Sequence, residues 1–316
     1  MEEALVQQWP DIPYPPWKDT AAALHQWLQI VGKYRLACVP WVNHSWHATL
    51  YPSSRGLTTS VIHARGQGVQ VDFDFIDHRL RVSVSDGGEQ TMRLHAMPVA
   101  EFHGRFRELL RELGVDIPFH GTPNEIEGAI AFERNTAPGA YDADAANRFF
   151  RALLQVDRVL ERFRSGFLGK VSPVHLFWGS FDIAVTRFSG RSAPPHPGGI
   201  PALPDAITRE AYSHEVSSAG FWAGGGPIDF PAFYSYAYPA PEGFASQAVS
   251  PAEAYFDEKL GEFLLPYDAV RTAVDPDAVL LGFLQSTYDA AANLAGWPRD
   301  QLDCAPGRPR IVRPIP

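Results

Sequence analysis

The sequence predicts an α+β protein of two similar halves, each a small, mainly antiparallel sheet packed on helices. Three observations predict this class. Segments with helical and strand periodicity occur in blocks rather than in strict alternation, which is typical of α+β proteins. A similar order of elements occurs twice along the chain. The 316 residues are 45% hydrophobic and 20% charged, an ordinary composition for a globular protein with a sizeable core.

We expect three regions along the chain. Residues 1–18 form a Pro-rich N-terminal arm, residues 19–135 the first half and residues 136–316 the second half. Within the second half, residues 190–243 are rich in Pro and Gly, which favours loop over regular structure. This stretch is too long for an ordinary connection, and its Trp and Tyr residues are not typical of a disordered linker. We therefore expect an ordered lid that covers a pocket and contributes His214.

The first half is expected to contain two helices around a hairpin. Asp19 can cap a helix whose apolar residues recur at helical spacing, with Gly32 as its stop. Alternating segments at 69–75 and 80–84 predict a β-hairpin, and an amphipathic helix over 99–113 closes the half. The charged residues of the hairpin are expected to form cross-strand ion pairs rather than a catalytic carboxylate pair: Asp72, Asp74, Arg79 and Arg81.

The second half repeats this order with longer elements. The longest expected helix runs from Asp142 to about Leu168, and strand-like runs follow at 174–178 and 181–188. A capping-box pattern predicts a short helix after Ser250. An amphipathic helix over 276–295 closes the half.

An internal repeat supports the division into halves. Ile30–Lys33 and Phe167–Lys170 both place Gly-Lys at an expected helix end, and a strand-like run with a histidine follows each, at His44 and His175. Duplication would relate the halves by a pseudo-twofold axis and place these histidines across a shared crevice, where pockets tend to form. Chance, together with the frequency of Gly-Lys at helix ends, is the alternative explanation.

The sequence also excludes several function classes. Motifs for dinucleotide binding, P-loops, nucleophile elbows, zincins and redox dithiols are absent; His214 and Glu215 begin like a zincin helix, but Ser218 replaces the second histidine. Two cysteines are too few for a disulfide framework. The net charge of −9 disfavours nucleic acid, and no apolar run is long enough to span a membrane. We expect a cytoplasmic protein whose partner is a small molecule, with neither nucleic acid nor membrane.

Three clusters of histidine and aromatic residues are the candidates for chemistry, centred on His44, His175 and His214. A histidine can act as general acid or base at neutral pH, a carboxylate can fix its tautomer, and aromatic walls can exclude water. The predicted catalytic residues are His175, Asp182, Tyr212, His214 and Glu215. The predicted ligand-binding residues are Trp46, Trp178, Arg187, Arg191, Phe221, Trp222 and Tyr234.

The same histidines could also bind a metal ion. One histidine from each cluster (His44, His175 and His214), with a carboxylate from Asp182 or Glu215, is a composition that suits zinc or non-haem iron. A metal-free polar pocket and a merely packed aromatic core are the alternatives.

Several long segments of the chain resemble a bacterial family catalogued only as a domain of unknown function. They are NHSWHATLY, GLTTSVI, FDFIDHRL, RFRSGFLGKVSPVHLFWGSFDIAVTRFSGR, AYSHEVSSAGFW, FYSYAYP and EFLLPYDAVR, and the resemblance extends roughly from Trp9 to Trp297. It implies one full-length unit rather than two unrelated domains, and it implies no activity, cofactor or catalytic residue. Ala223 departs from the proline expected after Phe221 and Trp222, which affects only the local loop.

The favoured function is an enzyme that acts on a small, partly apolar or aromatic molecule. Its chemistry would be histidine-centred acid–base catalysis in a pocket between the halves. One alternative is a non-catalytic protein that binds a small ligand in the same pocket. Another is a structural or interaction protein whose aromatic residues only pack. The sequence leaves the substrate and the oligomeric state open.

Overall fold

The computed structural model describes residues 9–226 and 228–313. Its strands fall into an N-terminal group and a C-terminal group along the chain. The N-terminal strands are β1 (Thr49–Pro52), β2 (Gly56–Thr58), β3 (Ile62–Ala64), β4 (Gln67–Asp74), β5 (Arg79–Val84) and β6 (Glu89–Arg93). The C-terminal strands are β7 (His175–Phe177), β8 (Asp182–Ser192), β9 (His214–Trp222), β10 (Ala232–Tyr238), β11 (Tyr255–Asp257) and β12 (Glu262–Pro266). The helices are α2 (Tyr14–Cys38), α3 (Val99–Glu112), α4 (Ala143–Arg164), α5 (Asp205–Ala211), α6 (Tyr267–Arg271), α7 (Pro276–Leu294) and α8 (Arg299–Leu302).

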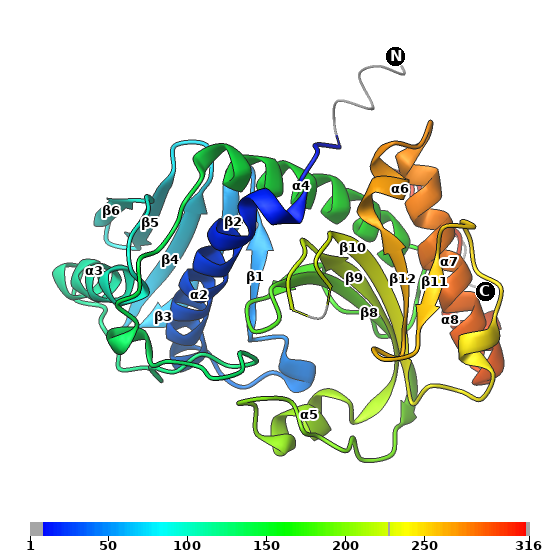
Figure 1. Cartoon of the computed structure of the whole chain (residues 1–316). Helices are drawn as coiled ribbons and strands as arrows, with labels where there is room; N and C mark the ends of the chain where they lie inside the picture. The colour runs from blue at the N-terminus through cyan, green and yellow to red at the C-terminus, as the bar shows by residue number, and fades with distance from the viewer. Residues whose placement is uncertain (1–8, 227, 314–316) are drawn as a thin grey trace.

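These described strands form one 12-stranded antiparallel sheet, which confirms the predicted α+β class (Figure 1). The strand order is β11-β12-β10-β9-β8-β7-β1-β2-β4-β5-β6, and β3 pairs with β4. The pairing of β1 with β7 joins the strands of the first predicted half to those of the second. Both predicted halves therefore contribute to a single sheet.

Helices cover the sheet on both sides and leave one hollow face. Helices α4 and α7 pack against β8, β9 and β10 from behind. Helix α2 crosses the middle of the molecule, in contact with α3, α4 and β3 (Figure 1). The other face of β8, β9 and β10 is concave and is turned towards α2 and α5 (Figure 1). Among the described residues, no helix combines the length and the apolar character that a membrane span needs.

Helix α2 is longer than the sequence predicts at both ends. It begins at Tyr14, with a proline in its first turn, where proline is tolerated, so the expected Pro-rich arm is wrong from this residue onward. Gly32 lies inside the helix instead of ending it. A Cβ atom at Gly32 would stand closer than 3.0 Å to three atoms of the Trp178 ring. The close approach of Trp178, rather than a helix end, explains this glycine.

The other predicted elements of the first half are confirmed with one correction. The hairpin forms as β4 and β5, with Asp74 opposite Arg79, and the amphipathic helix forms as α3. The expected cross-strand ion pairs are wrong, because Asp74 pairs with Arg55 at 2.5 Å and Arg81 lies 3.9 Å from Glu89. Asp74 therefore forms its ion pair with Arg55 and not with Arg79, the residue opposite it in the neighbouring strand.

In the second half, the two long helices are confirmed and the short one is not. The Asp142 side chain caps α4 through the Ala145 N–H at 3.0 Å, and α4 ends four residues before Leu168. Helix α7 begins at Pro276 as predicted. Residues after Ser250 form a turn, so the predicted short helix is wrong.

The stretch 190–243 is not a long loop, because it contains β9 and β10 in the interior of the sheet. Most of its described Pro and Gly residues lie in the connections around these strands, whereas Gly190 lies in β8 and Gly220 in β9. Only residues 193–213, which include α5, contribute cover over the concave face. The predicted lid is therefore wrong for the strands, and a lid formed by residues 193–213 stays a prediction.

The internal repeat is not shown by the structure. Ile30–Lys33 lies inside α2, whereas Phe167–Lys170 lies beyond the end of α4. His44 lies in a short 3-10 helix, η1 (Asn43–Ser45), whereas His175 lies in strand β7. The two matched segments thus have different local structures.

Candidate functional site

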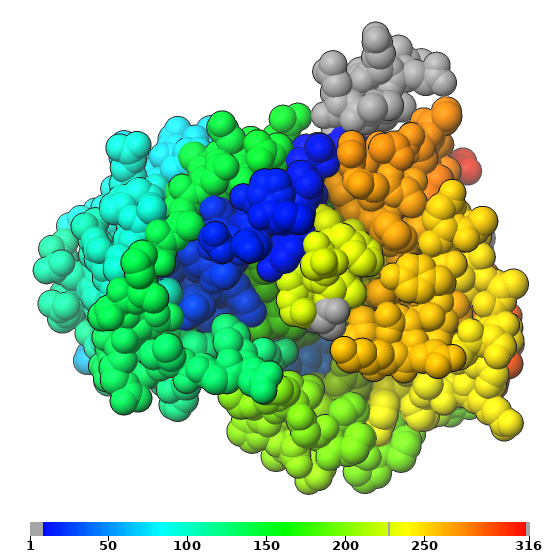
Figure 2. Space-filling view, in the orientation of Figure 1, coloured from blue at the N-terminus to red at the C-terminus, as the bar shows by residue number. Residues whose placement is uncertain are grey.

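A cavity of about 170 Å³ lies on the concave face of β8, β9 and β10 and is covered by residues 193–213. We call it the concave-face cavity. It is similar in size to a cavity that holds one benzene molecule, about 150 Å³. In Figure 2 the surface is hollowed between α2, the covering segment and the loop that follows β9. Its lining residues include His44, Trp46, Glu125, Phe177, Asp182, Thr186, Phe188, Tyr212, Ser218, Tyr234 and Tyr236.

The space for this cavity comes from small residues on the strands beneath it. Alternate residues of a strand point to the same face, so Ala184, Ser218 and Gly220 share a face with the tyrosines of β10. Gly220 lies opposite Tyr234, and a Cβ atom there would stand closer than 3.0 Å to the tyrosine hydroxyl. The absence of a side chain at Gly220 lets Tyr234 lie flat across the sheet.

Asp182 is the first residue of β8, and its side chain is held by two hydroxyl groups. The hydroxyls of Ser180 and Tyr234 each donate to one of its carboxyl oxygens. The residue is only 5% exposed, and burial raises the pKa of its carboxyl group although both hydrogen bonds act to lower it. The aspartate is thus a fixed hydrogen-bond acceptor at the wall of the cavity.

A second carboxyl group reaches the same cavity from the connection between α3 and α4. Glu125 has a φ of 59°, which is uncommon for glutamate, and its N–H donates to the Pro201 carbonyl at 3.1 Å. Its carboxyl group lies against Gly179, where a Cβ atom would stand closer than 3.0 Å to it. Burial, with a further contribution from Asp182, raises the pKa of Glu125 to about 7, and Lys33 opposes this shift.

His44 contributes a hydrogen-bond acceptor with a defined tautomer. Its Nδ1 lies 2.7 Å from the Ala211 carbonyl oxygen, which can only accept, so Nδ1 carries a proton. Its Nε2 is buried and makes no hydrogen bond within the described residues. Burial lowers the pKa of His44, so the neutral ring is favoured and Nε2 carries a free lone pair.

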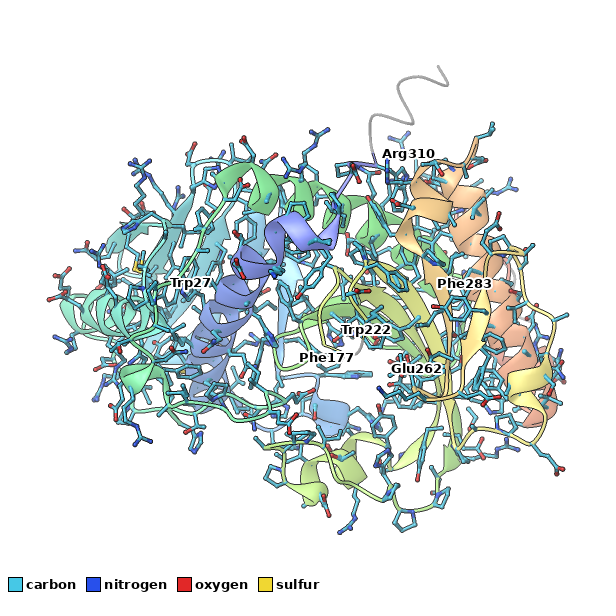
Figure 3. The ribbon with its side chains drawn as sticks, viewed as in Figure 1. Trp27, Phe177, Trp222, Glu262, Phe283 and Arg310 are labelled. Atoms are coloured by element: carbon cyan, nitrogen blue, oxygen red, sulfur yellow. The ribbon has the colours of Figure 1, made fainter. Side chains whose placement is uncertain are left out.

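A row of tyrosines forms the floor of the cavity on the side of β10. The hydroxyls of Tyr212 and Tyr236 lie 2.7 Å apart, and the ring of Tyr234 lies 4.5 Å from that of Trp222. Behind them, Glu262 has a buried Oε2 without a hydrogen-bond partner in the described chain, and burial raises its pKa to about 8. Figure 3 shows Phe177, Trp222 and Glu262 around the concave face.

Five of the sequence-predicted site residues line this cavity together: His44, Trp46, Asp182, Tyr212 and Tyr234. Trp222 and Trp178 instead line two neighbouring cavities, of about 480 and 90 Å³, and Glu125 borders all three cavities. Glu125 is not among the predicted site residues, because nothing in its Pro- and Gly-containing connection distinguishes it from a solvent-exposed glutamate.

Two predicted ligand-binding residues lie on the opposite face of the sheet. The guanidinium group of Arg187 is buried over the rings of Phe163 and Tyr288, at 3.5 and 4.3 Å, and donates to the Phe163 carbonyl at 2.5 Å. Burial lowers its pKa to about 10. Phe221 packs against Phe233 in the core. Both are offset by one residue from the strand positions that face the cavity, so neither is placed to contact a ligand in it.

Glu215 and Arg191 pair with each other instead of serving the cavity. Their side chains lie 2.7 Å apart, and the Ser189 hydroxyl also donates to Glu215 at 2.8 Å. Glu215 follows His214 on β9, and successive strand residues point to opposite faces. Glu215 is therefore not the partner of the His214 ring, and Arg191 is not placed to bind a ligand in the cavity.

The three histidines that were expected to converge do so only in part. The rings of His44 and His214 lie 5.7 Å apart, but His214 does not line the cavity. His175 is 1% exposed and packs against Tyr51 and Phe177, and burial together with Arg35 and Arg164 lowers its pKa to about 3. Neither is placed as the predicted catalytic base.

This arrangement does not assemble the predicted metal ligands. Residues 9–226 and 228–313 contain no group of three histidine, cysteine, aspartate or glutamate residues that could hold a metal ion. Zinc or non-haem iron stays a prediction that lacks an assembled ligand set.

Comparison with known proteins adds a family but no activity. No curated protein and no solved structure matches the chain. The model of DUF5996, described as a family of unknown function, matches residues 9–304, in agreement with the resemblance seen in the sequence. Because this match covers most of the 316 residues, the chain belongs to the family DUF5996.

Proposed function

We propose that the protein is an enzyme that binds a small, partly aromatic molecule in the concave-face cavity and catalyses a proton-transfer step on it. The observation that carries this proposal is that His44, whose Nε2 is buried and has no partner among the described residues, lines a cavity together with two carboxyl residues. A neutral imidazole with a free Nε2 is suited to act as a general base near neutral pH.

The two carboxyl groups are suited to different roles. Glu125, with a pKa of about 7, is present in both protonation states at neutral pH and can give or take a proton. Asp182 is held in place by Ser180 and Tyr234, which suits it to orient a donor group of the ligand. Pairs of carboxyl groups in unlike environments are a recurring arrangement in acid–base enzymes.

The size and walls of the cavity define the kind of molecule. The rings of Trp46, Phe177 and Phe188 provide apolar surface, and the volume suits one aromatic ring with a short substituent. In this proposal the general base is His44, and not His175 or His214 as the sequence predicts. His214 is then a neighbour that limits the space around the His44 ring.

A turnover screen tests the proposal. The wild-type chain is incubated with a library of single-ring aromatic and heteroaromatic metabolites, and consumption is followed by mass spectrometry. We expect conversion of at least one compound, and we expect His44→Asn to slow it by about 100-fold or more. Asparagine suits this test because it tolerates the positive φ of 61° at this position.

The matched control is His63→Gln, at an exposed histidine on β3 that does not line the cavity. It should convert the same compound at the wild-type rate. Wild-type turnover by folded His44→Asn would refute the assignment of the base. Binding of library compounds without any conversion would identify a non-catalytic binding protein instead.

A further inference from the structure

The concave-face cavity is rich in hydrogen-bond acceptors and poor in positive charge. Glu125, Asp182 and the Nε2 of His44 are acceptors, and none of the described lining residues is lysine or arginine. Four of the hydroxyls that also line it are paired with one another, Thr186 with Ser218 at 2.8 Å and Tyr212 with Tyr236. The Thr208 hydroxyl, also in the lining, is buried without a hydrogen-bond partner among the described residues. A ligand that donates hydrogen bonds would satisfy this wall, whereas an anion would meet two carboxyl groups and no lining lysine or arginine.

The aromatic walls favour the same kind of ligand. A cation near the face of an aromatic ring is attracted by the ring quadrupole. Lys170, just outside the lining, already occupies this position at two of the rings, with its Nζ 5.2 Å from the Trp46 ring and 5.0 Å from the Phe188 ring, so a ligand cation would lie towards Phe177. Glu262 adds a further carboxyl group behind Tyr236.

We propose that the concave-face cavity selects a small organic amine in its ammonium form, with a single aromatic ring or an apolar body of that size. This inference rests on the proposed function for its choice of cavity and adds the chemical class of the substrate. The ammonium group donates to Glu125 and Asp182, and the apolar body lies against Trp46, Phe177 and Phe188. His44 Nε2 accepts a further N–H or the proton that the reaction removes.

Protonation of Glu125 gives the proposal a distinctive pH dependence. A pKa of about 7 means that this carboxyl group is half protonated at neutral pH, and a bound cation stabilises its ionised form. Ammonium binding should therefore release protons and weaken as the pH falls below 7. The charged and titratable groups around Glu125 include Asp182, which raises its pKa, and Lys33, which lowers it. Tyr212, whose pKa Glu125 helps to raise, and His44 line the same cavity. His25, whose own pKa is lowered by burial, and Glu127 line the neighbouring cavity with Glu125.

Calorimetry with three probes tests the proposal on the full chain. Benzylamine, benzyl alcohol and benzoate have the same ring and carry positive, neutral and negative head groups at pH 7.5. We expect benzylamine to bind at least tenfold more tightly than benzyl alcohol, and benzoate not to bind. Between pH 7.5 and pH 6 the benzylamine affinity should fall severalfold.

Variants separate a specific site from a general effect of charge. Glu125→Gln should weaken benzylamine binding at least tenfold and remove its pH dependence, without changing benzyl alcohol binding. Glu133→Gln removes the same charge from an exposed residue outside the cavity and should leave all three affinities unchanged.

Equal or tighter binding of benzyl alcohol or benzoate would overturn the amine inference, and so would the absence of benzylamine binding. Either result leaves the proposed function standing if the turnover screen finds a His44-dependent conversion of an uncharged or anionic compound. Benzylamine binding without any turnover would instead support the amine site and refute the enzyme.

Discussion

Replacement of Gly32 by alanine tests how α2 is packed against the rest of the molecule. In the interior of a free helix, alanine is more favourable than glycine by about 1 kcal/mol. At Gly32, however, the new Cβ atom would stand closer than 3.0 Å to three atoms of the Trp178 ring, where ordinary contacts begin at 3.4 Å. A buried indole ring cannot move away by several tenths of an ångström without disturbing its own neighbours, so the cost should approach the upper end of about 1–3 kcal/mol known for overpacking.

The net expectation for Gly32→Ala is a loss of about 2 kcal/mol in the free energy of unfolding, measured by urea denaturation at pH 7. Gly104→Ala is the matched control, because Gly104 lies inside α3 with no atom within 4 Å of the added Cβ. The control should stabilise the protein by about 0.5–1 kcal/mol. Equal or higher stability of Gly32→Ala, at an unchanged denaturant slope, would refute the packing of Trp178 on this helix.

Two further predictions concern the site and its surroundings. Gly179→Ala should displace the flexible end of Glu125, weakening benzylamine binding while changing the unfolding free energy by less than about 1 kcal/mol; unchanged binding in calorimetry would contradict the placement of Glu125. Because His175 has a pKa of about 3 when folded, only the unfolded chain takes up its proton between pH 6.5 and pH 3, so stability falls as the pH falls. By pH 5 this loss should be about 2 kcal/mol, and chemical denaturation of His175→Phe should show a shallower pH dependence; an identical dependence would contradict it.

Local sequence patterns predicted the elements that depend on local signals. Helix α4 has an aspartate cap and a regular apolar stripe, and the β4–β5 hairpin has strict alternation, so both form as expected. Strands β9 and β10 were missed because the Pro and Gly content of the whole stretch outweighed the alternation within it. The pattern Phe233, Tyr234, Ser235, Tyr236 has a period of two and is buried on both faces. The Pro and Gly content averaged over about fifty residues does not reveal strands as short as β9 and β10, which have nine and seven residues.

The same error accounts for most of the misplaced site residues. Had β9 been recognised, its alternation would have separated His214 from Glu215 and Phe221 from Trp222. Arg187 lies in the strand-like run predicted at 181–188, and the alternation of that run already places it on the face opposite Asp182 and Thr186. Glu125 could not have been found in this way, since it reaches the cavity from an irregular connection and its position depends on contacts far along the chain.

The covering segment of residues 193–213 not only covers the cavity but also holds His44 and Glu125 in place through hydrogen bonds. The Ala211 carbonyl fixes the tautomer of His44, and Glu210 accepts from the His44 N–H at 3.1 Å. The Pro201 carbonyl accepts from the Glu125 N–H. His44 and Glu125 come from opposite ends of the first half of the chain, and both are held by this one segment. Displacement of the segment would free Nδ1 of His44 and the backbone of Glu125 together, so the proposed base and its neighbouring acid depend on the same closure for their geometry.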